Sequence, residues 1–170
     1  MRYLCCFLDS KHYTEPEFKI FPSLLIAYGS CIQDIASRYK SKPEEIIQMA
    51  EFDEKPHLSG HPTERIKYTK NNTSVVYEIF KIPENADHLL VWHHGYEGSG
   101  FYLMTTKGSI TADTCRKMLD EDVEKELRED KEAEICFEDM DRTVVDCKYE
   151  WHGWSVVDAR SKGVLQACGL

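Results

Sequence analysis

The sequence predicts a single α+β domain over residues 1–170, in which an N-terminal helical hairpin and a long acidic helix pack on a mainly antiparallel β-sheet. Three observations predict this class. Apolar residues recur at helical spacing near the N-terminus and again after residue 111. The segments between and after these stretches are enriched in Val, Ile, Tyr and Phe, which favour strands. The turns between the first four of these strands are too short for the crossovers of parallel strands, which favours antiparallel pairing.

Two helices are predicted to form the hairpin. The first covers residues 21–39, where apolar side chains recur at the spacing of one helix face, and Pro22 suits its first turn. The second begins at Ser41, a residue type that caps helices. Pro43 and two carboxylates follow it, and negative charge is favoured at this end of the helix dipole.

The remaining apolar segments are predicted to be strands. A loop over residues 53–63, which contains Pro, Gly and His, separates the helices from a meander of four consecutive strands. Residues 11–19 are predicted to be a polar connection. In chain order, the predicted strands cover residues 2–8, 65–70, 74–82, 88–94, 101–106, 134–137, 144–152, 154–158 and 164–168. Apolar and polar side chains alternate over residues 144–152, which places Cys147 on a buried face and Glu150 on an exposed face.

A long acidic helix is predicted after the meander, with Thr111 as its N-cap and apolar positions up to residue 127. Cys115 belongs to the apolar stripe, so we expect it to be buried rather than nucleophilic. Residues 113–141 include 13 acidic and five basic residues, a net charge of −8, whereas the whole chain carries −9. Such asymmetry predicts an acidic surface that attracts a basic partner protein. The alternative is a solvated helix face with internal ion pairs.

Composition limits the classes of function. The chain has 30 acidic and 21 basic residues, so we expect no direct binding to nucleic acid or to anionic membranes. No segment approaches the roughly 20 apolar residues of a membrane-spanning helix, and the N-terminal apolar run is too short for a signal peptide. Seven cysteines without paired spacing predict reduced thiols, and hence a cytoplasmic location. The spacing of the cysteines and histidines predicts no metal site and no cofactor.

The glycine-rich segment that starts at Trp92 contains candidate catalytic residues. His93, His94 and Glu97 lie beside three glycines, and imidazole titrates near neutral pH, so a small hydrolase or transferase is one hypothesis. The alternative is a hairpin tip, because strands are predicted on both sides. Adjacent histidines on a strand point to opposite faces, which disfavours a metal ion shared between them.

The sequence favours a small intracellular interaction protein, an inhibitor or accessory factor, that binds a basic partner protein. The predicted binding residues are four carboxylates and two aromatic side chains: Glu121, Glu124, Glu129, Asp130, Tyr96 and Trp154. Trp154 belongs to a Trp-His-Gly-Trp segment whose rings suit either an interface anchor or the core. A third class is a structural subunit that buries its tryptophans against copies of itself.

Overall fold

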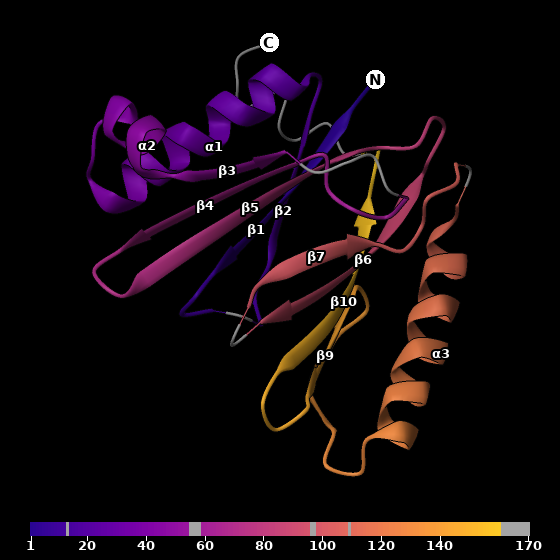
Figure 1. Cartoon of the computed structure of the whole chain (residues 1–170). Coiled ribbons are helices and arrows are strands. Elements are labelled where there is room, and N and C mark those ends of the chain that lie inside the picture. The colour runs from indigo at the N-terminus through magenta and orange to yellow at the C-terminus, as the bar shows by residue number, and fades with distance from the viewer. Residues whose placement is uncertain (13, 55–58, 96–97, 109, 161–170) are drawn as a thin grey trace.

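The computed structural model describes residues 1–12, 14–54, 59–95, 98–108 and 110–160. These residues form three helices and ten strands (Figure 1). In chain order they are β1 (Tyr3–Asp9), β2 (Glu17–Phe21), α1 (Leu24–Tyr39), α2 (Pro43–Met49), β3 (Glu51–Glu54), β4 (Glu64–Lys70), β5 (Thr73–Lys81), β6 (His88–Gly95), β7 (Gly100–Leu103), α3 (Ala112–Glu129), β8 (Glu134–Glu138), β9 (Arg142–Asp146) and β10 (Trp151–Asp158).

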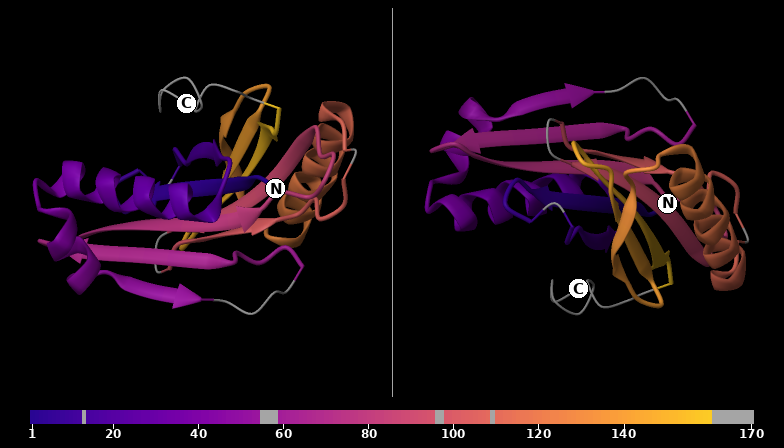
Figure 2. Two further views of the ribbon diagram at one scale, coloured as in Figure 1. Left: turned by 90° about the horizontal axis from the view of Figure 1, so that it is seen from above. Right: turned by 90° about the horizontal axis from the view of Figure 1, so that it is seen from below.

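The strands form two five-stranded antiparallel sheets. The first has the order β2-β1-β5-β4-β3, and the second has the order β7-β6-β10-β9-β8. Side chains from β1 and β5 pack against side chains from β6 and β7 in one buried cluster, so the two sheets face each other. Figure 2 shows α1 and α2 at the opposite end of the molecule from α3.

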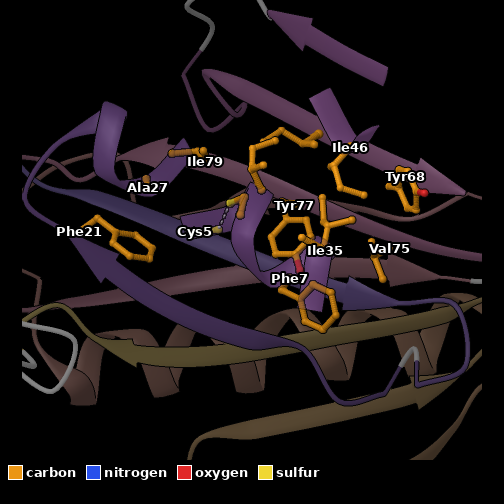
Figure 3. Packing of buried hydrophobic residues seen from close by; sticks show 14 residues of the cluster. Cys5, Phe7, Phe21, Ala27, Ile35, Ile46, Tyr68, Val75, Tyr77 and Ile79 are labelled. Carbon is orange, nitrogen blue, oxygen red and sulfur yellow. Dashed lines mark hydrogen bonds between the residues drawn. The ribbon is translucent and has the colours of Figure 1, made fainter. Parts of the chain in front are cut away.

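Each sheet carries helices on its outer face. Side chains of α1 and α2, including Ile35 and Ile46, pack on Cys5, Phe7 and Tyr77 of the first sheet (Figure 3). On the second sheet, α3 packs three buried side chains, those of Cys115, Leu119 and Val123. They contact a cluster that includes Leu90, Val145 and Trp154 of the sheet. The layers therefore run helix, sheet, sheet, helix.

The fold mixes α and β structure, but the predicted arrangement of a helical hairpin and a long acidic helix on one sheet is wrong. The four strands predicted as one meander are two hairpins in different sheets, β4 with β5 and β6 with β7. The acidic helix packs on the second sheet and the N-terminal helices pack on the first. Every residue from Val75 to Phe80 is buried, so β5 needs a layer on each of its faces, and local spacing does not reveal which layers these are.

Several predicted boundaries also change. The segment predicted as a polar connection contains β2, which pairs with β1. Residues 144–152 are not one strand, because β9 ends at Asp146 and β10 begins at Trp151. The first two residues of the predicted loop 53–63 lie in β3, and the predicted strand at 164–168 lies outside the described residues.

The predicted helix starts are correct for α3 and shifted for the other two. Thr111 is the N-cap of α3, where its hydroxyl accepts a hydrogen bond from the Thr114 N–H. In α1 the cap is Ser23, because Phe21 belongs to β2. In α2 the residue before Pro43 takes the cap position in place of Ser41. Within the described part of the chain, none of the helices combines the length and apolar character needed to cross a membrane.

The buried phenol of Tyr77 predicts a loss of stability at alkaline pH. Tyr77 donates its O–H to Asp34, and burial followed by this hydrogen bond raises the pKa of Tyr77 far above its ordinary value. The unfolded chain releases this proton near about pH 10, whereas the folded chain keeps it. The stability that the protonated phenol contributes is therefore fully present below about pH 10 and declines as the pH rises above it. Urea unfolding at about pH 8 and about pH 11 should show a smaller alkaline loss for Tyr77→Phe than for the wild type.

Part of the alkaline loss should remain in Tyr77→Phe. The hydrogen bond with Cys31 and then burial raise the pKa of the Cys5 thiol, and burial raises the pKa of the Cys6 thiol, so both thiols act in the same direction. Equal losses in the wild type and in Tyr77→Phe would contradict the role given to the phenol.

Candidate functional site

Three side chains of metal-ligating type meet beside the C-terminal half of α3. Glu126 lies on α3, Cys147 directly follows β9, and His152 lies on β10. Cys147 Sγ is 3.2 Å from Glu126 Oε1 and 3.8 Å from His152 Nδ1. His152 Nδ1 also contacts Glu126 Oε1, and the ligand-type atoms of the three residues all lie within 4.8 Å of one another. We call these three residues the Glu-Cys-His cluster.

Local structure brings the cluster together. The turn between β9 and β10 closes with a hydrogen bond from the Cys147 N–H to the Glu150 carbonyl at 2.9 Å, and Lys148 takes a left-handed φ of 70°. This turn holds Cys147 against α3. His152 is two residues before Trp154 on β10, so both side chains lie on the face that α3 covers. Glu126 lies three residues after Val123, which extends the buried stripe of α3 with a carboxylate.

A second pair of polar side chains extends the cluster outward. His152 Nε2 is 3.2 Å from Glu150 Oε2, and the other oxygen of Glu150 is 3.1 Å from His94 Nδ1. The Trp92 ring stacks on His94 and meets His152 edge-on, with centroids at 5.1 and 5.3 Å. An open hollow of about 360 Å³ adjoins these groups, and it is lined by Trp92, Tyr102, Met104, Asp122, Glu126 and His152.

The protonation states within the cluster depend on one another. The hydrogen bond to Glu126 raises the pKa of His152 against the opposing effect of burial, and the same bond lowers the pKa of Glu126. Burial and the hydrogen bond to Glu126 raise the pKa of Cys147 to about 12. The shared hydrogen bond therefore favours the charged forms of His152 and Glu126, whereas Cys147 is held as a thiol at neutral pH. A thiol of this kind is a poor nucleophile.

The structure separates the two histidines that the sequence singled out. They lie on opposite faces of β6, as their adjacency predicts. His93 is completely buried, and its ring lies against Gly153 of β10. His94 is half-buried and contacts Glu150. Only His94 therefore lies near the Glu-Cys-His cluster, whereas Glu97 and Tyr96 lie outside the described residues.

The predicted binding residues are divided between surface and core. Glu121, Glu124 and Glu129 are exposed on α3, and Asp130, at the end of this helix, is half-buried. Trp154 is completely buried and donates its indole N–H to Asp122 Oδ2 at 2.7 Å, so it forms no part of the surface. Cys115 is buried as expected, and burial raises its pKa to about 11.

Sequence reasoning did not assemble the Glu-Cys-His cluster. The alternation predicts that Cys147 and Glu150 lie on opposite faces of one strand, whereas both lie in the turn between β9 and β10. The available signal is Glu126, which, like Asp122, places a carboxylate on the mainly apolar face of α3. No family model matches the sequence, and no curated protein or solved structure matches the chain.

Proposed function

We propose that the protein is a small acidic interaction protein, an inhibitor or accessory factor, that binds a basic surface of a partner protein through the outward face of α3. The observation that supports this proposal is the division of α3 into two faces. Cys115, Leu119 and Val123 are buried against the second sheet, and the carboxylates that remain exposed include those of Glu121, Glu124 and Glu129. Five carboxylates and three basic side chains of α3 are exposed, and this acidic excess attracts a partner of opposite charge.

Bases within the same segment offset only part of this charge. Arg116 pairs with Asp120 at 3.2 Å and with Glu138 at 3.3 Å, and Lys117 reaches Glu121 at 4.0 Å. Such exposed pairs contribute little free energy, so a partner can readily exchange them. Glu124 and Glu129 form no ion pair with any residue that the structure describes.

The acidic surface continues onto β8, the edge strand of the second sheet. All five residues of β8 are exposed, and the acidic Glu134 and Glu138 flank Ile135 and Phe137, which are 42% and 37% exposed. Charged groups speed and orient association, and apolar groups beside them add contact area. A surface with both kinds of group supports the proposed binding of a protein. With a net charge of −9, we propose neither nucleic acid nor an anionic membrane as the partner.

The proposal includes a reducing, cytoplasmic location. Its support is that the described cysteines are all free thiols, four of them buried: Cys5, Cys6, Cys31, Cys115, Cys136 and Cys147. Free thiols persist where glutathione and thioredoxin keep them reduced. Mass spectrometry of protein alkylated directly in cell lysates should find these cysteines unpaired.

Charge reversal on α3 tests the proposed surface. A photoreactive amino acid at position 124 should cross-link the partner protein and so identify it. The affinity between the two purified proteins is then measured. We expect Glu121→Lys/Glu124→Lys/Glu129→Lys to weaken binding by roughly 100-fold or more, because each lost attraction becomes a repulsion. Raising salt from about 0.05 M to about 0.5 M should weaken wild-type binding by roughly tenfold, because exposed charges are screened.

A matched variant separates this surface from net charge. Glu15→Lys/Glu51→Lys/Glu84→Lys changes the total charge equally at three exposed carboxylates outside the 113–141 segment. It should keep most of the affinity. The proposal fails if both triple variants lose affinity equally, or if wild-type binding is indifferent to salt.

A further inference from the structure

We propose that Glu126, Cys147 and His152 bind a Zn²⁺ ion, with one coordination position open toward the hollow beside Trp92. This site is separate from the proposed docking surface, because the cluster lies at the edge of α3 that faces the second sheet. The sequence spacing predicts no metal site, since the three residues lie on α3, in the turn after β9 and on β10.

The donor atoms suit zinc. One thiol sulfur, one imidazole nitrogen and one carboxylate oxygen are the three ligand types that zinc accepts in proteins. Tetrahedral zinc with bonds of about 2.0–2.3 Å places its ligand atoms roughly 3.3–3.8 Å apart. Cys147 Sγ is 3.2 Å from the Glu126 oxygen and 3.8 Å from the His152 nitrogen, close to this spacing, whereas Glu126 Oε1 and His152 Nδ1 are in hydrogen-bond contact and have to move apart to admit the ion. A thiolate and an imidazole also disfavour Mg²⁺ and Ca²⁺, which prefer oxygen ligands.

The histidine is already oriented as a ligand. A metal-bound imidazole usually donates its second N–H to a carboxylate, which fixes the ring and its tautomer. His152 has Nδ1 in the cluster and Nε2 at 3.2 Å from Glu150 Oε2, and Glu150 is in turn held by His94 Nδ1 at 3.1 Å. Glu150 is therefore a positioning residue, and His94 acts one contact further out.

The cysteine is held in place from two sides. Its backbone N–H closes the turn between β9 and β10, and its sulfur faces Glu126 on α3. Glu126 and His152 also line the open hollow, so a metal ion bound between them would present its free position to water or a small ligand. A thiolate and a carboxylate offset the two charges of the ion, and the surrounding segment adds further negative charge.

The competing explanation is a hydrogen-bonded network with no metal, in which His152 bridges Glu126 and Glu150. Cobalt distinguishes the two, because a thiolate bound to Co²⁺ gives a charge-transfer band in the near ultraviolet that no hydrogen bond produces. The full chain is purified under reducing conditions and treated with a chelator. It is then titrated with Co²⁺, and Zn²⁺ is added to displace the cobalt. Competition with a zinc indicator gives the affinity for Zn²⁺. We expect one equivalent of Co²⁺ to produce the band, and one equivalent of Zn²⁺ to abolish it.

Variants assign the ligands. Cys147→Ser should lose the cobalt band, whereas Cys136→Ser, which removes an exposed thiol on β8, should keep it. Glu150→Gln should keep the band and weaken Zn²⁺ binding by about 10–100-fold, the usual effect of losing a carboxylate that orients a ligand. His152→Gln should weaken Zn²⁺ binding more than Glu150→Gln does, and circular dichroism of the metal-free proteins checks that each variant folds.

Two results would overturn the zinc site. One is a folded wild-type protein that gives no cobalt–thiolate band. The other is a band that survives Cys147→Ser and disappears in another cysteine variant, which would place the ion elsewhere. Because the titration requires no partner protein, its failure leaves the docking proposal unaffected.

Discussion

Trp154→Ala should lower the free energy of unfolding by about 3–5 kcal/mol, the usual cost of truncating a large buried aromatic side chain. Trp154 is completely buried and packs with Leu119 and Val123 of α3. Its indole N–H also donates to Asp122 Oδ2 at 2.7 Å. The substitution leaves a cavity between α3 and the second sheet, because backbone elements on both sides limit collapse. A lower urea midpoint and a Tm reduced by roughly 6–20 °C are expected.

Two further variants identify the cause of this loss. Trp154→Phe keeps an aromatic ring but removes the N–H, so it should cost much less than Trp154→Ala. Tyr149→Ala removes an aromatic ring that is 71% exposed and should change stability within about 0.5 kcal/mol. A Trp154→Ala protein about as stable as Tyr149→Ala would show that α3 does not pack on β10 as described.

The second large effect is expected at Gly153, where β10 meets β6 most closely. A Cβ added to Gly153 would lie 1.9 Å from Cε1 of His93 and 2.6 Å from both ring nitrogens. Gly153 and His93 are register partners, and His93 is completely buried, so the ring has little space into which it can move. Gly153→Ala should therefore cost about 1–3 kcal/mol or more through overpacking, measured by urea unfolding.

A double-mutant cycle attributes the cost to the imidazole. In a His93→Ala background the ring is absent, so Gly153→Ala should cost much less than it does in the wild type. Gly29→Ala is the matched control, because Gly29 lies within α1 and, apart from its chain neighbours and the backbone of its own helix, nothing lies within 4 Å of the added Cβ. That change should stabilise the protein by up to about 1 kcal/mol, since alanine is the better helix former. Equal costs for Gly153→Ala in both backgrounds would contradict the predicted clash.

The two proposals use different edges of one helix. Glu121, Glu124 and Glu129 face solvent, whereas Glu126 faces the turn between β9 and β10. The packing of Trp154 against Leu119 holds α3 in the position that presents both the exposed glutamates and Glu126.

Local patterns were sufficient for features that depend on neighbours in the chain. The hydroxyl of Thr111 caps α3 because capping involves residues three positions apart. The acidic and apolar faces of α3 follow from helical periodicity, and the opposite orientation of His93 and His94 follows from the two-residue period of a strand. These features need no knowledge of what the rest of the chain does.

Features that depend on distant partners required the folded chain. Periodicity indicates that a side chain points inward but not which layer it meets, so strands of two sheets were predicted as a single meander. The alternation of apolar and polar residues over 144–152 runs across the turn between β9 and β10, where Lys148 has a left-handed φ of 70°. Glu126, Cys147 and His152 meet only once α3 packs across β9 and β10, and contacts formed by such packing leave no regular spacing in the sequence.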